Sequence, residues 1–114
     1  MPVETRTLLF DKDELRKAVH DHVVRKGLAS AEDRVNTLNI EAESKGTVVA
    51  SLVDGSGSSR KLELSYGDVT KALIQYCRAH QIPLPRYGDK QLTPAGDGMA
   101  LMVRMVFSPP DRPA

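Results

Sequence analysis

The chain has 114 residues, which is enough for one domain with a single two-layered core. Apolar residues make up 40% and charged residues 27%, a composition typical of a globular protein and not of a disordered one. The formal net charge of +1 argues against a strong general attraction to nucleic acids or anionic membranes. We expect one domain at residues 1–107 and a disordered, proline-rich tail at residues 108–114.

The sequence also carries signals of location. It contains no apolar run long enough to cross a bilayer, and its N-terminus lacks the pattern of a signal peptide. Cys77 is the single cysteine, so no internal disulfide forms, and this usage is typical of the reducing cytoplasm. We therefore expect a cytoplasmic protein that does not associate with membranes.

The N-terminal part predicts a short strand at residues 3–10 and an amphipathic helix from Lys12 to about Lys26. Asp11 and Glu14 have the spacing of a capping box, and Gly27 suits the left-handed position after a helix. One face of this helix carries the residues expected in the core, which are Leu15, Ala18, Val19, His22 and Val23. The helix is therefore expected to pack against another element.

The period of the apolar residues then changes from helical to twofold, which predicts strands. These strands are expected at residues 35–43, 47–53 and 60–64, joined by turns at 44–46 and 54–59. Short turns join antiparallel neighbours, so the three segments predict a meander.

A second helix follows, because Ser65 and Asp68 again form a capping signal. It should end near Gln81, since Pro83 disfavours helical geometry at the residue before it. The segment Ile82-Pro83-Leu84-Pro85 is expected to be extended and stiff. A short strand at residues 90–93 and a turn at 94–98 complete this part of the prediction.

Residues 99–107 form the most apolar segment and alternate as a strand whose two faces are both largely apolar. Strands of this kind are usually covered on both faces. Since only two helices are predicted, we expect the second cover from another subunit, with Met102, Arg104 and Val106 as the candidate interface. The predicted class is α+β: an antiparallel sheet, made of the meander plus a C-terminal strand or hairpin, packed on one face by two helices.

The sequence predicts no catalytic site, no cofactor and no metal. His20 and His22 would point roughly 160° apart on a helix, and Cys77 with His80 would supply only two metal ligands. The glycine- and serine-rich residues 55–61 lack the helix that follows a phosphate-binding loop. No serine or cysteine has the motif of an activated nucleophile. We therefore expect a protein that is not an enzyme.

A basic segment after the second helix provides the candidate binding residues, which are Arg78, Arg86, Tyr87 and Lys90. The stiff prolines before Arg86 would hold it and Tyr87 in place with little entropy to lose on binding. Arginine and tyrosine beside rigid proline suit a carboxylate, a phosphate or a protein groove. The alternative is a helix end followed by solvated charges.

The letters ALIQYC at residues 72–77, the letters IPLPR at 82–86, Lys90 and the last apolar strand resemble a group of small bacterial hypothetical proteins. This resemblance covers the C-terminal part of the domain and implies no activity. The order helix, meander, helix is also similar to that of a double-stranded-RNA-binding domain. Such domains carry a lysine cluster where this chain has only Lys71, a departure that argues against RNA binding.

Two functions follow from these patterns. The first is a non-enzymatic interaction or assembly module that forms a homodimer or binds another protein. The alternative is weak binding of nucleic acid or an anionic ligand by the basic cluster around residues 78–90.

Overall fold

A computed structural model describes residues 2–41, 46–85 and 88–106 of the chain. The elements follow one another as β1 (Val3–Phe10), α1 (Lys12–Arg25), β2 (Arg34–Glu41), β3 (Thr47–Val53), β4 (Ser59–Ser65), α2 (Tyr66–Ala79), β5 (Asp89–Ala95) and β6 (Gly98–Val106). The predicted α+β class is confirmed. The predicted tail at 108–114, the residues Arg86 and Tyr87, and most of the 44–46 turn lie outside the described residues.

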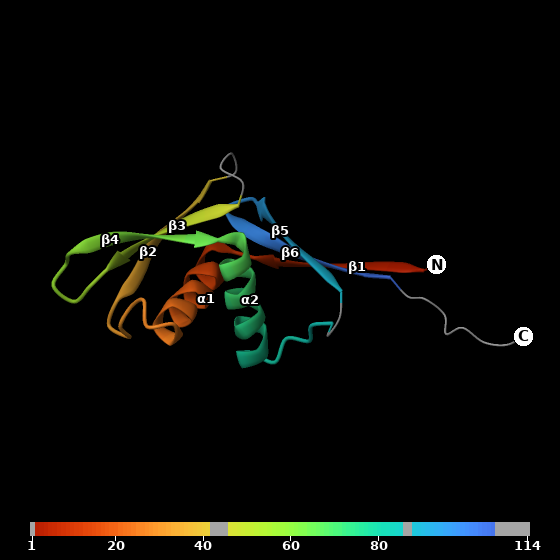
Figure 1. Ribbon diagram of the computed structural model, residues 1–114, viewed down its shortest axis with the longest axis horizontal. Helices are drawn as coiled ribbons and strands as arrows, with labels where there is room; N and C mark the ends of the chain where they lie inside the picture. Colours follow the sequence, from red (N-terminus) through yellow and green to blue (C-terminus); the bar gives the residue numbers. More distant parts are fainter. Residues whose placement is uncertain (1, 42–45, 86–87, 107–114) are drawn as a thin grey trace, which may run out of the picture.

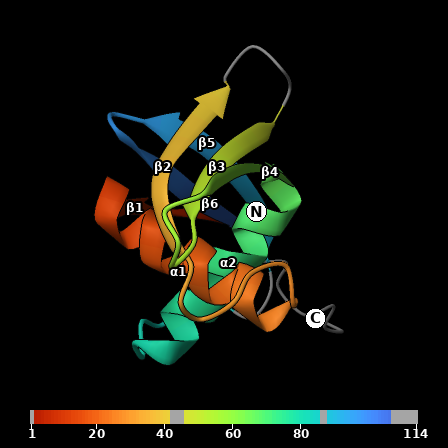
Figure 2. The ribbon, with the colours of Figure 1, turned by 90° about the vertical axis from the view of Figure 1, so that its left-hand side faces the viewer.

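The strands form two antiparallel sheets of three strands each, where the sequence predicts one, because the C-terminal hairpin pairs with β1 and not with the meander. One sheet has the order β2–β3–β4 and is the predicted meander, whereas the other has the order β1–β6–β5 and joins the C-terminal hairpin to the N-terminal strand. Figures 1 and 2 show both helices on the same side of the strands. In the part of the chain described above, no helix is long and apolar enough to cross a membrane.

Both predicted helix starts are confirmed by hydrogen bonds at their first turns. The Glu14 amide donates to the Asp11 carboxylate at 2.8 Å, and the Asp11 amide donates to the Glu14 carboxylate at 3.0 Å. Ser65 and Asp68 form the same reciprocal pair at the start of α2. These bonds satisfy amide groups that a helix start otherwise leaves without partners.

The end of α2 and the last hairpin differ from the prediction. The helix ends at Ala79, and Gln81 follows with a left-handed backbone at φ 57°, a geometry that the sequence does not reveal. β5 runs through Pro94 to Ala95, so the turn contains only Gly96 and Asp97. Proline is tolerated there because β5 is an edge strand, and Gly96 supplies the positive φ that a two-residue hairpin turn requires.

One core lies between the helices and the two sheets. α1 contributes the face predicted from its periodicity, and β3 alternates buried and half-buried residues. The largest fully buried side chains are Leu15, Leu52, Leu73, Met99, Leu101, Val19, Val23, Val48, Val69 and Val103. Gly98 is required where β6 begins, because a Cβ at this position would overlap the carbonyl oxygen of Phe10.

The N-terminal part of β1 and the C-terminal part of β6 extend beyond the helices. The two strands pair residue for residue from Phe10 with Met99 to Val3 with Val106, without a bulge. Phe10 is buried, but the five residues of β1 from Val3 to Thr7 are all exposed. In Figure 1 the paired ends of β1 and β6 extend past the helices on the right-hand side.

Candidate functional site

The structure brings two of the predicted binding residues together. Arg78 lies in the last turn of α2 and Lys90 lies in β5, yet both line one hollow of about 420 Å³. Its remaining wall is apolar and includes Ile82, Leu84 and Pro85. Arg86 and Tyr87 lie outside the described residues, so the structure places only two of the four predicted binding residues.

A second hollow of about 400 Å³ lies between the two helices and shares Ile74 and Arg78 with the first. We call the two hollows together the α1–α2 groove. The charged and polar residues of the second hollow are His22, Arg25, Lys26, Lys71, Gln75 and Arg78. Among the residues that the structure describes, the groove therefore gathers five cationic side chains when Lys90 is counted, and none of its lining residues is acidic.

Sequence reasoning missed the contribution of α1 to this groove. No pattern in the sequence singles out Arg25, and Lys26 is expected only to end the first helix. The signal was available in part, because Lys71 and Arg78 are seven residues apart and thus lie on one side of α2. That α1 packs beside this face of α2 is a tertiary fact, and it adds Arg25 and Lys26 to the same hollow.

Few of these cations are neutralised. Lys26 Nζ lies 4.0 Å from a carboxylate oxygen of Asp68, and Arg25 donates to the side-chain oxygen of Gln75 at 3.2 Å. Across residues 2–41, 46–85 and 88–106, neither Lys71 nor Arg78 has an ion pair. The positive charge in the middle of the groove is therefore available to a ligand.

His22 is one of the residues that line the second hollow. Its side chain is buried, with 7% of the residue exposed, and its Nε2 atom has no hydrogen-bond partner. Burial lowers the pKa of His22 below its ordinary value, and the neighbouring Lys26 and Lys71 lower it further against the opposing effect of Asp68. His22 therefore contributes a neutral imidazole with a buried, unpaired Nε2 to the lining of a hollow that also carries four cationic side chains.

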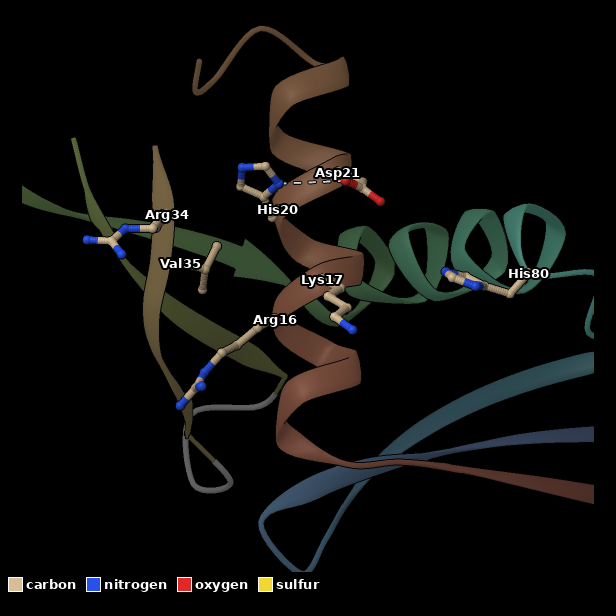
Figure 3. A pocket seen from close by; sticks show the side chains of 7 residues that line it. All are labelled: Arg16, Lys17, His20, Asp21, Arg34, Val35 and His80. Atoms are coloured by element: carbon tan, nitrogen blue, oxygen red, sulfur yellow. Dashed lines mark ion pairs between the residues drawn. The ribbon is translucent and has the colours of Figure 1, made fainter. Parts of the chain in front are cut away.

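A third hollow, of about 470 Å³, lies on the other side of α1 (Figure 3). Arg16 extends from α1 toward β2, whereas His80 follows the last residue of α2 and lies at the far side of α1. His20 is already engaged, since its ring contacts the Asp33 carbonyl at 2.8 Å and the Asp21 carboxylate at 3.6 Å. The side chains of this hollow do not converge on one point, so we do not treat it as a site.

Cys77 is not placed for nucleophilic chemistry. Its thiol is fully buried in the core, and burial raises the pKa of Cys77, with a smaller contribution from Glu14. A thiol with a raised pKa contains little of the reactive thiolate. Cys77 therefore packs in the core.

The predicted interface residues share one face of β6. Met102 is half-buried, while Arg104 and Val106 are exposed. We call this face of the β1–β6–β5 sheet the outer face, and the cross-strand register assigns to it Val3, Thr5, Thr7 and Leu9 of β1, Ala100, Met102, Arg104 and Val106 of β6, and Asp89, Gln91 and Thr93 of β5. Leu9 is 71% exposed there, which is high for a leucine flanked by core residues.

Among the described residues, no group of three or more His, Cys, Asp and Glu side chains is arranged to hold a metal ion. Comparisons with protein-family models, curated proteins and solved structures find no match to this chain.

Proposed function

We propose that this chain is a non-enzymatic assembly module that forms a homodimer through the free edge of β1. The observation that carries the proposal is an eight-residue edge strand, paired on one side only and exposed from Val3 to Thr7. Such an edge presents a row of backbone amide and carbonyl groups that can pair with another strand. A second copy of β1 is the occupant that fits this edge best.

The charges of β1 support self-pairing. Glu4 and Arg6 are its two charged residues, and they flank Thr5 symmetrically. When two copies of β1 pair antiparallel about a twofold axis through Thr5, each Glu4 lies opposite Arg6 of the second copy. Two opposite-charge pairs then form, and directly opposed pairs of this kind stabilise antiparallel strands.

Neighbouring registers lack this complementarity. A twofold axis perpendicular to the sheet pairs only residues on the same face, so it must pass through a residue and not between two residues. The neighbouring registers are therefore centred on Glu4 and on Arg6. Centring the axis on Glu4 places two glutamates together, and centring it on Arg6 places two arginines together. The charges therefore select the register that is centred on Thr5.

The same register extends the outer face across the dimer. Val3 lies beside Val106 within one chain and would lie opposite Thr7 of the second copy, which is beside that copy's Met102. Val3 and Val106 are 49% and 48% exposed, so this row gathers apolar surface that is otherwise in water. The contact is small, and interfaces of this size are typically weak.

Sedimentation equilibrium over a range of micromolar concentrations tests the dimer. The wild-type chain is expected to associate reversibly, and Arg6→Glu should weaken association by about tenfold or more, because four acids then meet at the interface. Glu4→Arg should act in the same way with four arginines. An equimolar mixture of these two variants should associate again, since each arginine then lies opposite a glutamate.

Met102→Lys distinguishes edge pairing from packing of one outer face on another. Edge pairing places Met102 beside the contact, so this variant should weaken association only modestly. A wild-type chain that stays monomeric throughout would overturn the proposal. Loss of the dimer in Met102→Lys, together with its survival in Arg6→Glu, would move the interface from the edge to the outer face.

A further inference from the structure

We propose that the α1–α2 groove binds a small ligand that carries a phosphate group and an apolar or planar organic part. The site is independent of β1 and of the dimer. The two hollows of the groove have volumes of about 420 Å³ and 400 Å³, and each is within the usual range for small-molecule sites, which extends from about 300 Å³ to 1,000 Å³.

The cationic half of the groove suits a phosphate. Lys71 and Arg78 approach from α2, and Arg25 and Lys26 approach from the last turn of α1. Among these four cations, and within the described residues, only Lys26 has a carboxylate partner, at 4.0 Å, which is at the limit of an ion pair. Arg25, Lys26 and Arg78 lie near the C-terminal ends of their helices, where the helix dipole stabilises positive side chains, so their placement costs the fold little.

A second observation, the unpaired Nε2 atom of His22, also points to a ligand. A buried polar nitrogen without a partner costs free energy, and most such atoms in folded proteins are hydrogen-bonded. His22 lines the cationic hollow, and its Nε2 is buried without a hydrogen-bond partner. After a small reorientation of the ring, Nε2 would donate a hydrogen bond to an oxygen atom of a phosphate in that hollow.

The other half of the groove suits an organic group. Ile82, Leu84 and Pro85 are half-buried along the extended segment after α2, and they share their hollow with Ile74. Lys90 and Arg78 lie at its rim and would reach a second polar group. A phosphate beside His22 and an apolar group against Ile82, Leu84 and Pro85 would thus lie in two hollows that share Ile74 and Arg78.

A small ligand fits these features better than a nucleic acid backbone does. Nucleic acid binding depends on cations spread along many phosphates, and the chain has a net charge of only +1. Here four cationic side chains line one hollow, together with a buried histidine. That arrangement is typical of a site for one phosphate group.

NMR titration of the ¹⁵N-labelled full chain with inorganic phosphate and with AMP tests the proposal. Phosphate should shift the signals of His22, Lys26, Lys71 and Arg78. AMP should bind more tightly and also shift the signals of Ile82 and Leu84, which separates a phosphomonoester with an organic part from the free ion. Bound phosphate should raise the pKa of His22, because the anion favours the protonated imidazole.

The variant Lys71→Gln/Arg78→Gln should weaken the binding of both ligands by about tenfold or more. Both residues are exposed, so the fold is expected to survive this change. The matched control Lys12→Gln/Lys61→Gln removes two exposed lysines away from the groove and should leave both affinities unchanged.

Three results would overturn the proposal. One is the absence of shifts with either ligand at low salt. Another is an equal loss of affinity in the control variant, which would mean that net charge alone attracts the anions. The third is tighter binding of a single-stranded oligonucleotide than of AMP, with shifts spread beyond the groove, which would assign the cations to a nucleic acid.

Discussion

The two sheets of this protein differ in how far the helices cover their middle strands. β3 alternates buried and half-buried residues along its whole length of seven residues. β6 has nine residues and is buried from Gly98 to Leu101 and at Val103, whereas Arg104 and Val106 are exposed. Both strands have two neighbours, so backbone pairing is the same and only the cover differs. β6 thus carries apolar residues beyond the reach of the helices, as expected for a surface that a partner completes.

The sheets also differ in how the chain enters them. The segment after α1 leads to β2 through Gly27, and the segment after α2 leads to β5 through Gln81. Both residues have a left-handed backbone, with φ of 73° and 57°. The hydrogen bonds match as well, since Leu28 donates to the Val23 carbonyl at 2.9 Å and Ile82 donates to the Cys77 carbonyl at 2.7 Å. Both helices therefore end in the same motif, but α1 has glycine, the favoured residue, at the left-handed position, whereas α2 has glutamine.

The largest effect is expected from two matched leucine substitutions in the β1–β6–β5 sheet. Leu101→Ala leaves a cavity in the core and should lower the free energy of unfolding by about 2–5 kcal/mol. Leu9→Ala removes a side chain that is mostly in water, so it should change the stability of the monomer by less than about 0.5 kcal/mol. Urea denaturation of monomeric protein measures both. Equal losses would show that the outer face is covered within the monomer.

Much of this architecture was predictable, because its signals are local. The capping boxes at Asp11 and Ser65, the twofold alternation of the meander and the apolar β6 each lie within a short segment. The pairing of β1 with β6 joins the two ends of the domain, and no local pattern specifies it. The strands consequently divide into two sheets, an arrangement that the sequence did not reveal.

The candidate groove was predictable only in part, for the same reason. Arg78 and Lys90 stood out because they are close in the sequence, and the structure places them in one hollow. Lys71 and Lys26 read as ordinary surface charges, because charged residues on the polar face of a helix are the norm. Only the packing of α1 beside α2 brings them together around His22.

Substitutions at the left-handed positions of the two helix ends should change the stability in opposite directions. Gly27→Ala forces a side chain into the left-handed region and should destabilise the protein by about 1 kcal/mol, although no atom lies near the new Cβ. Gln81→Gly removes that cost from α2 and should stabilise the protein by about 0.5–1 kcal/mol. The midpoints of urea unfolding at an unchanged m-value measure both effects. A loss of stability in Gln81→Gly would mean that the glutamine side chain has contacts worth more than the backbone strain.

The smallest change in stability is expected from a change of pH. It concerns the helix-covered end of the molecule, because His22 of α1 lines the hollow between the two helices. Its pKa is lowered in the folded state, so the unfolded chain binds more protons in the window between the folded pKa and the ordinary value of 6.5. Stability should therefore be complete above pH 6.5 and decline as the pH falls through that window. Lys26 and Lys71 disfavour the imidazolium and Asp68 favours it, while Arg25 and Arg78 line the same hollow. Urea unfolding as a function of pH should show a shallower slope in His22→Gln than in the wild type, and equal slopes would assign the acid sensitivity to other groups.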